Sequence, residues 1–423
     1  LAGQTQLDYV VNHSEVRVLF VSQDNLELGR NTVNACSRTV TLIPNDPPEW
    51  PVEASEQALH MPYATDNALL IYTSGTTGLP KGVLHSHASL LAGGLNTANA
   101  HQLTEDDRAL CVLSLCHING QVVTVMAPLV SGSSVVMPSR FSASKFWETI
   151  ADYKCTWFSV VPTILSYLVQ SKESLVPPSN EFSQLRFGRS ASAPLPPALL
   201  ESFVNRFQIP IVETMGITET AAQILSNPLD PVQQQVGSPG IPWGNDVRIA
   251  NELGMPLSTG HEGEIQVKGP NVMKGYLKNK AATQESFTSD NWYRTGDLGW
   301  MNEDGYFFVT GRQKELIIKG GENISPREID DVLYSHPAVL EAAAVAVPDS
   351  HYGQEIAACV VTKPGESVTI DELQAFCIVR LGNYKSPAKI QLLEELPKGP
   401  SGKIQRLQLV QHFAQINPLK MSS

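Results

Sequence analysis

Short apolar runs alternate with helix-like segments between residues 109 and 212, and this alternation restricts the chain to few folds. The strand-like runs cover residues 109–113, 134–137, 156–160, 185–187 and 209–212. Helices are expected from Ser142 or Ser144, from Pro162 and after Pro197, where apolar residues return at helical spacing. The alternation is typical of right-handed crossovers between parallel strands. We therefore expect an α/β fold with a mostly parallel sheet covered by helices.

The amino-acid composition changes near residue 230, where Gly and Pro become frequent. Short alternating runs at 264–267 and 306–309 predict antiparallel hairpins, and hence a small β subdomain between 230 and 310. A second change falls near Gly311, beyond which we expect a small α+β unit. Its strands and second helix are predicted at 338–347, 356–362, 390–393 and 370–381.

The first helix of this α+β unit has clear terminal signals. Ser325 is expected as the N-cap, Pro326 as the first helical residue, and Glu328 as the acceptor of a capping box. The helix is expected to run to His336, because Pro337 cannot continue it.

Composition sets limits on the class of protein. A chain of 423 residues with 42% hydrophobic and 17% charged residues is globular and long enough for two or three domains. A net charge of −12 argues against general binding to nucleic acid or to anionic membranes. The six cysteines form no CxxC pair, which argues against zinc or a disulfide framework.

Two features bear on location and completeness. No apolar run approaches the roughly 18 residues of a membrane span, and no leader precedes a cleavage site, so a soluble, cytoplasmic protein is expected. The chain opens at Leu1 without an initiator Met, which we interpret as a missing N-terminal segment.

A stretch rich in Gly, Ser and Thr follows the apolar run 68–71 and ends in Lys81 and Gly82. Glycines let backbone N–H groups approach a polyphosphate, hydroxyls add neutral donors, and the lysine adds a positive charge. A flexible surface turn is the alternative interpretation. A Walker A loop would need Ser or Thr directly after the lysine, so Gly82 disfavours a P-loop NTPase. The predicted phosphate-binding residues are Thr73, Ser74, Gly75, Thr76, Thr77, Gly78 and Lys81.

Three further stretches offer ligands for a nucleotide. Glu219 follows a predicted strand and can bind a hard cation, although a glutamate that answers a helix dipole is the commoner case. Asp297 can accept hydrogen bonds from ribose hydroxyls, with Arg312 as a donor to the same ribose. Lys403 lies on a Gly/Pro-rich segment near the C-terminus. Taken singly, these residues are also explained as a turn aspartate, a surface arginine and a solvated lysine.

Together and in this order, the stretches between residues 68 and 406 resemble the core motifs of the adenylate-forming superfamily of acyl-CoA synthetases, adenylation domains and luciferases. The resemblance implies a large multi-layer α/β N-terminal domain with a β subdomain, and a small mobile α+β C-terminal domain. The implied boundaries are 1–310 for the first domain, 311–314 for a hinge and 315–423 for the second.

The resemblance also implies a role for individual residues. The implied catalytic residues are Lys403, Glu219, His117 and Thr73, and Glu219 and Thr73 are the implied Mg²⁺ ligands. Besides the phosphate loop, Asp297 and Arg312, the implied ATP/AMP-binding residues are Ser192, Ala193, Pro194, Met215, Gly216 and Thr218. The hinge is Lys314, the CoA tunnel Gly320 and Gly321, and the acyl pocket His117, Asn119, Ser190 and Ala191.

The activity implied is that of an ATP-dependent carboxylic acid:CoA ligase, which forms acyl-AMP, releases pyrophosphate and transfers the acyl group to CoA. ATP, Mg²⁺ and CoA are the expected ligands. A ligase that loads an acyl-carrier protein, or a noncatalytic nucleotide-binding relic, is the alternative.

The chain departs from the family pattern at several positions. Met215 stands where most members place an aromatic ring against adenine, and a thioether can still pack on a base. Residues 113–120 hold no aspartate of the kind that binds an amino acid's ammonium group. The segment 189–193 is similar to oxalyl-CoA-synthetase-like members, but Asn119 and Ala222 replace their histidines. We therefore expect a modest-sized aliphatic or aryl acid.

Overall fold

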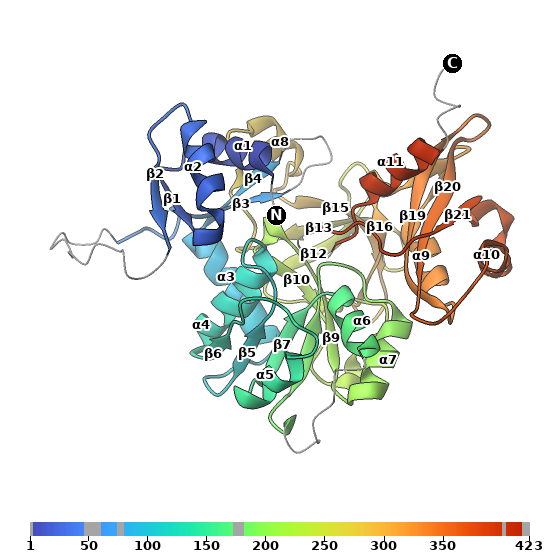
Figure 1. The fold of residues 1–423 in the computed structure, drawn as a ribbon, viewed down its shortest axis with the longest axis horizontal. Helices are drawn as coiled ribbons and strands as arrows, with labels where there is room; N and C mark the ends of the chain where they lie inside the picture. The colour runs from blue at the N-terminus through green and yellow to red at the C-terminus, as the bar shows by residue number, and fades with distance from the viewer. Residues whose placement is uncertain (1–2, 46–60, 74–79, 172–181, 400–402, 417–423) are drawn as a thin grey trace. The chain divides into compact units, whose positions relative to one another are not determined.

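The computed structural model describes residues 3–45, 61–73, 80–171, 182–399 and 403–416 (Figure 1). The chain divides into two compact units. The first comprises Leu1–Ala88 with Met273–Thr283, and the second comprises Ser89–Val272 with Gln284–Ser423. Both contain α and β elements, as an α/β chain requires.

The first unit contains two small sheets. One pairs β1 and β2 in parallel, and the other has the antiparallel order β14-β4-β3. Its elements are α1 (Gln4–Ser14), β1 (Val18–Val21), η1 (Gln23–Asn25), α2 (Leu26–Asn34), β2 (Thr41–Pro44), β3 (Asn67–Thr73), β4 (Lys81–Ser86), β14 (Gly275–Tyr276) and most of α8 (Lys280–Glu285). Because β3 and β4 are antiparallel neighbours, the Gly/Ser/Thr stretch connects the two strands of a hairpin.

A seven-stranded sheet is the centre of the second unit, with the order β11-β10-β9-β8-β7-β5-β6. Its strands are β5 (Arg108–Cys111), β6 (Ser134–Val136), β7 (Trp157–Val160), β8 (Phe187–Ser190), β9 (Ile211–Ile217), β10 (Ala222–Ser226) and β11 (Ile241–Pro242). All pairs from β6 to β9 are parallel, which confirms the predicted sheet. Only β10 and β11 add antiparallel pairs at the edge.

Helices cover this sheet because its strands are apolar on both faces. They are α3 (His87–Ala100), the π-helical segment η3 (Asn119–Met126), α4 (Ala127–Ser131), α5 (Phe146–Asp152), α6 (Pro162–Gln170) and α7 (Pro197–Phe207). One face is filled by aromatic and aliphatic side chains of α5, α6 and α7, which pack on Leu110 and Phe158 of the sheet. The expected helices are therefore present, and the apolar segment at 119–130 folds as η3 and α4.

The expected cap of α5 was wrong. The helix begins at Phe146 and its N-cap is Lys145, which makes no side-chain capping bond. The hydroxyls of Ser142 and Ser144 instead contact each other at 3.1 Å. Two adjacent hydroxyls that satisfy one another leave neither in position to cap the helix.

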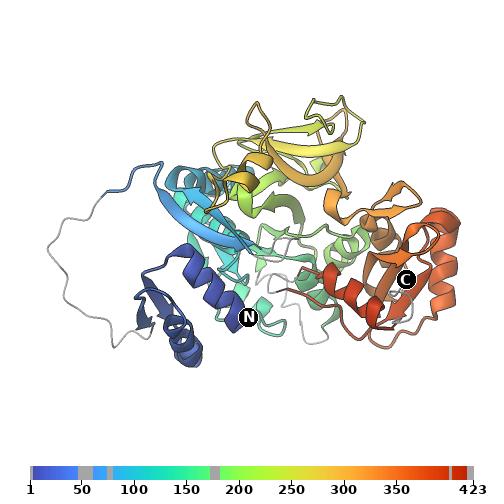
Figure 2. The same cartoon turned by 90° about the horizontal axis from the view of Figure 1, so that it is seen from above.

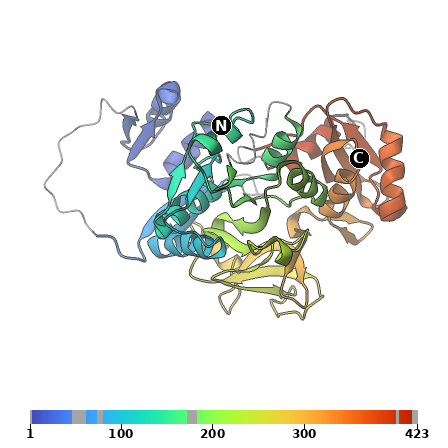
Figure 3. The same ribbon diagram turned by 90° about the horizontal axis from the view of Figure 1, so that it is seen from below.

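An antiparallel sheet with the order β12-β13-β15-β16 forms the β-rich part of the second unit (Figure 3). Its strands are β12 (Asp246–Ala250), β13 (Gly263–Lys268), β15 (Tyr293–Met301) and β16 (Phe307–Arg312). Ile249, Ile265 and Val267 of this sheet share a core with Ile224 and Leu225 of β10. The end of β16 is thereby fixed close to the central sheet, where the candidate site lies.

The C-terminal residues form a sheet with the order β18-β17-β20-β19, and β21 pairs with β20. The elements are η7 (Gln313–Glu315), β17 (Ile317–Lys319), β18 (Glu322–Ile324), α9 (Pro326–Tyr334), β19 (Val339–Asp349), β20 (Gly353–Thr362), α10 (Ile370–Lys385), β21 (Lys389–Leu392) and α11 (Arg406–Ile416). Ala342 and Ala344 of β19 face α9 and α10, whereas Ala343 and Val345 face α11. Alternation along one strand thus builds two cores, one on each side of the sheet (Figure 2).

Helix α9 starts as its sequence predicts but differs in detail. The Ser325 hydroxyl accepts from the backbone N–H of Arg327 at 3.2 Å, and Pro326 opens the helix. Glu328 was expected to complete a capping box, but it forms an ion pair with Lys385 at 2.9 Å. The Glu328 carboxylate therefore pairs with the Lys385 ammonium on α10 and does not cap the helix.

None of the helices in the described ranges combines the length and the apolar character that crossing a membrane requires.

Candidate functional site

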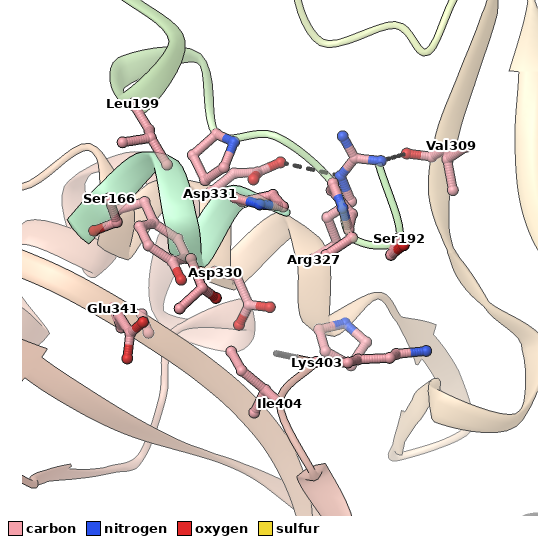
Figure 4. A pocket seen from close by; sticks show the side chains of 18 of the residues that line it. Ser166, Ser192, Leu199, Val309, Arg327, Asp330, Asp331, Glu341, Lys403 and Ile404 are labelled. Atoms are coloured by element: carbon pink, nitrogen blue, oxygen red, sulfur yellow. Dashed lines mark hydrogen bonds and ion pairs between the residues drawn. The ribbon is translucent and has the colours of Figure 1, made fainter. Parts of the chain in front are cut away.

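A cavity of about 530 Å³ lies within the second unit, between the central sheet, helices α6 and α7, and the C-terminal sheet with α9. Stretches that are far apart in the sequence, from Pro162 to Arg406, contribute to its lining. Figure 4 shows some of its side chains, among them Ser192, Arg327 and Lys403. Since its walls come from both the central sheet and the C-terminal elements, its shape depends on how these two parts pack.

Eight of the residues predicted to bind or activate ATP line this cavity. They are Ser192, Ala193, Pro194, Met215, Gly216, Asp297, Arg312 and Lys403. The first five lie at the carboxyl ends of the neighbouring parallel strands β8 and β9, which is where open α/β sheets bind ligands. Motifs that are separate in the sequence therefore line the same cavity.

Asp297 and Arg312 face each other across β15 and β16. Arg312 Nε donates to Asp297 Oδ1 at 2.6 Å, and its Nη2 donates to Oδ2 at 3.4 Å. The Asp297 carboxylate raises the pKa of Arg312, so this guanidinium stays charged. The pair offers both an acceptor and a donor at the cavity wall, as recognition of ribose hydroxyls requires.

Met215 and Gly216 lie on β9, next to a tight antiparallel return to β10. A Cβ added at Gly216 would lie 1.8 Å from the carbonyl oxygen of Ala222. Ala221 and Ala222 themselves have φ of 46° and 79°, in the left-handed region. The close approach therefore requires glycine at residue 216, and it fixes the position of Met215 beside it.

The segment that carries Lys403 is anchored to the C-terminal sheet. Lys398 pairs with Ile404 as an isolated bridge. Arg406 Nη2 donates to Asp330 Oδ2 of α9 at 2.5 Å, and Nη1 donates to the Ala344 carbonyl at 2.5 Å. These contacts hold the chain on both sides of Lys403, whose side chain extends along the cavity (Figure 4).

The surroundings of Lys403 change the pKa of its ammonium group. Desolvation in the cavity, followed by the positive charge of Arg312, lowers the pKa of the Lys403 ammonium, although part of the side chain stays exposed. Nearby Glu315 and Asp297 act in the opposite direction. An anion such as a phosphate group would relieve the repulsion between Lys403 and Arg312.

Thr218 and Glu219 form the short segment η5 (Thr218–Thr220), directly after β9. Neither contributes to the cavity lining, but the Glu219 carboxylate contributes to the raised pKa of Arg312, so it lies within electrostatic range of that wall. No group of three or more His, Cys, Asp or Glu side chains in the described ranges is placed to hold a metal.

The predicted hinge and CoA-tunnel residues lie outside the cavity lining. Lys314 is exposed in η7, immediately after β16. Gly320 and Gly321 connect β17 to β18 with φ of 57° and 89°, a tight turn that favours glycine. Lys319 braces this turn, because its Nζ forms an ion pair with Glu355 at 2.7 Å.

Thr73 and Lys81 belong to the first unit and are paired across the end of the β3–β4 hairpin. The Lys81 ammonium lies 5.0 Å from the centre of the Tyr276 ring, a cation–π contact. The predicted phosphate-binding residues Ser74, Gly75, Thr76, Thr77 and Gly78 lie outside the described residues.

The predicted acyl-pocket residues are not among those that line the cavity. Ser190 and Ala191 are buried at the end of β8, and His117 and Asn119 lie at the start of η3. Asn119 Nδ2 donates to Ser192 Oγ at 3.3 Å, which connects this group to the cavity. His117 lowers the pKa of the Cys116 thiol to about 7 by hydrogen bonding.

Sequence reasoning missed Glu213, a cavity residue that is only 6% exposed. Its Oε1 accepts from the backbone N–H of Leu195 at 3.2 Å, and burial raises its pKa to about 7 despite the nearby Arg327. The available signal was a carboxylate directly after the apolar run 209–212. Glu213 lies six residues before Glu219, in the same motif.

Comparison with known proteins gives the family. Residues 2–277 match the family described as AMP-binding enzyme. Residues 328–403 match the AMP-binding enzyme C-terminal domain. The chain belongs to the AMP-binding enzyme family. Within this family, the sulfoacetate–CoA ligase of Cupriavidus necator is 48% identical over 97% of this chain and 81% of its own length.

Two solved structures of AMP-binding enzymes agree with the fold. ATP-bound MatB from Rhodopseudomonas palustris has a TM-score of 0.89 at 28% identity, covering 98% of this chain and 82% of its own. The O-succinylbenzoate coenzyme A synthetase of Bacillus subtilis, in complex with ATP and a magnesium ion, has a TM-score of 0.84 at 32% identity, covering 96% and 82%. The predicted superfamily, fold class and enzyme class, an AMP-forming acid–CoA ligase, are confirmed.

Proposed function

We propose that this protein activates a small carboxylic acid with ATP and transfers the acyl group to CoA, with Lys403 as the catalytic cation of the first step. The observation that carries the assignment is the cavity, which Lys403 lines together with the Asp297–Arg312 pair, Met215 and Ser192. Support for a small acid also comes from the relatives, since sulfoacetate and O-succinylbenzoate are named in two of them.

In the first step, a carboxylate oxygen of the acid bonds to the α-phosphorus of ATP, and the bond from that phosphorus to pyrophosphate breaks. Negative charge builds up at the α-phosphate in the transition state. A lysine ammonium placed in a partly desolvated cavity stabilises such charge more strongly than it would in water. Lys403 has this setting, and Asp297 with Arg312 would hold the ribose.

A bound Mg²⁺ ion would offset charge on the phosphates, and Glu219 and Thr73 are the residues proposed to hold it. Carboxylate and hydroxyl oxygens are hard donors that suit this ion. The remaining phosphate contacts are assigned to Lys81 and to the stretch Ser74–Gly78, with Thr218 beside Glu219. Ala193, Pro194 and Gly216 would supply the narrow walls around adenine.

In the second step, the CoA sulfur bonds to the acyl carbon, the bond from that carbon to the AMP oxygen breaks, and the thiol proton goes to solvent. We assign residues 1–310 and 315–423 to two moving parts that pivot at 311–314, with Lys314 as the hinge. Support for this proposal comes from the cavity, which Lys403 lines and Gly320 and Gly321 do not. Rotation would remove Lys403 and bring the glycine turn to the CoA path.

The test is product analysis by mass spectrometry after incubation with ATP, Mg²⁺, CoA and a panel of small acids. Formation of an acyl-CoA together with AMP and pyrophosphate is the expected result. Formation of ADP, or of no product with any acid, would contradict the assignment. The names of the relatives support CoA and give no support to an acyl-carrier protein. A cytoplasmic location stays a prediction.

A further inference from the structure

Arg189 is a charged side chain at the centre of the sheet. It lies on β8, opposite Ser159 of β7 and Val212 of β9, and is only 1% exposed. Its Nη1 donates to Asn119 Oδ1 at 3.0 Å and to Ser159 Oγ at 3.1 Å. Both partners are neutral. Among the described residues, no carboxylate lies within ion-pair distance of Arg189, and its Nε has no hydrogen-bond partner.

A buried guanidinium without an anionic partner is costly. The penalty for burying an unpaired charge amounts to several kcal/mol, and here burial lowers the pKa of Arg189 to about 9. Arg186, three residues earlier, has the ordinary arrangement, because it forms an ion pair with Asp107 at 2.7 Å. A buried positive charge without such a partner is expected where an anionic ligand supplies the compensation.

A chain of hydrogen bonds connects Arg189 to the cavity through Asn119 and Ser192, and donors and acceptors are ordered along it. Arginine can only donate, so the oxygen of the Asn119 amide must face it and the NH₂ group must face away. Asn119 Nδ2 accordingly donates to Ser192 Oγ at 3.3 Å, and Ser192 lines the cavity. The amide dipole thus points its positive end towards the cavity, in the same sense as the field of Arg189. The Ser192 hydroxyl, having accepted this bond, keeps its own hydrogen for a ligand.

We propose that Arg189, acting through Asn119 and Ser192, makes the protein select acids that carry a second anionic group beside the carboxylate that is activated. This inference rests on the proposed function. The second group is a carboxylate or a sulfonate, because both present oxygen atoms that the Ser192 hydroxyl and the positive field stabilise. Arg189 is a specificity-determining residue that does not itself touch the reacting atoms.

The experiment measures kcat/KM in acid-dependent exchange of labelled pyrophosphate into ATP. Acetate is compared with oxalate and sulfoacetate, and propionate with malonate, so that each pair differs mainly in the second charge. The wild-type protein is expected to prefer at least one dianion over its matched monoanion by tenfold or more. In Arg189→Met, that dianion should lose at least tenfold, whereas the monoanions should change less than threefold. Carboxylate and sulfonate dianions are scored separately.

Two further variants keep the test decisive if Arg189→Met does not fold. Asn119→Asp is nearly isosteric and gives Arg189 an internal carboxylate, so it should fold and yet lose the dianion preference. Arg189→Lys should keep most of that preference. Arg186→Met is the matched control, and it should lower thermal stability without changing the ratio of dianion to monoanion rates.

The outcomes separate the two proposals. Exchange that favours monoanions in the wild-type protein, or equal losses for both acid types in Arg189→Met and Asn119→Asp, would overturn the role of Arg189 and leave the ligase assignment intact. Absence of exchange with every acid would overturn the proposed function itself.

Discussion

The guanidinium of Arg312 and the carboxylate of Asp297 form an in-register pair across two antiparallel strands, with Nε 2.6 Å from Oδ1. Arg312 is the last residue of β16, and the exposed Lys314 follows two positions later. The residue pair assigned to the ribose is therefore directly connected to the proposed pivot. A nucleotide that binds this pair would also restrain the segment about which the C-terminal elements are proposed to turn.

Asp297→Asn should weaken ATP binding. The substitution removes the charged acceptor and leaves Arg312 beside a neutral amide, and a hydrogen bond to a charged group contributes about 1.5–3 kcal/mol. We expect KM for ATP to rise by roughly tenfold to a hundredfold. The measurement is a steady-state titration with ATP at saturating acid. Asp290→Asn, which removes the carboxylate that pairs with Arg248 of β12 in the same sheet, serves as the control and should leave KM unchanged.

Lys403→Ala should separate the two half-reactions. Loss of an ammonium that stabilises transition-state charge typically costs about a hundredfold to a thousandfold in rate. Adenylate formation should fall by that amount, while thioester formation from supplied acyl-adenylate and CoA should change only a few-fold. Rapid-quench assays measure each step. Lys389→Ala, an exposed lysine on β21, is the control. Equal loss of both steps would refute the division of labour.

Gly216→Ala should destabilise the turn between β9 and β10. Because the new methyl group would lie 1.8 Å from the Ala222 carbonyl oxygen, the two strands must separate. Such overpacking costs about 1–3 kcal/mol or more. The expected result is a lower Tm together with weaker ATP binding through displacement of Met215. Gly3→Ala is the comparison, since no atom lies within 4 Å of the added Cβ. A Tm equal to that of the wild type would show that the turn between β9 and β10 is not rigid.

Glu213 should make stability depend on pH. Its native pKa of about 7 exceeds the ordinary value of 4.5, so between these values the native protein binds more protons than the unfolded chain. The Glu213 contribution is thus most favourable below pH 4.5 and is lost as pH rises through 7, with a full range of roughly 3 kcal/mol. Comparison of Tm at pH 5 and pH 8 should show a smaller decrease in Glu213→Gln than in the wild type. Identical decreases would contradict the raised pKa.

The sequence predicted those features that depend on local pattern. Apolar runs located the strands from β5 to β9, and Ser325 with Pro326 located the start of α9. The predicted capping-box role of Glu328 and the predicted cap of α5 were wrong. Glu328 pairs with Lys385, which lies far along the chain, and the Ser142 and Ser144 hydroxyls contact each other instead of the helix.

The candidate site was predictable only in part. Motif spacing identified Lys403, Asp297 and Arg312, which do line one cavity. It gave no role to Glu213 or Arg189, since their significance comes from burial against residues tens of positions away. For Arg189, the sequence does show a charged residue directly after Phe187 and Gly188 of the strand. Roles assigned to Lys314, Gly320 and Gly321 stay predictions.

The most direct test of the account is acid-dependent exchange of labelled pyrophosphate into ATP, measured for the wild-type protein and for Lys403→Ala at saturating ATP and Mg²⁺. We predict exchange that requires a small carboxylic acid and that falls by at least a hundredfold in the variant. Exchange that needs no acid, or that proceeds equally well without the Lys403 ammonium, would contradict it.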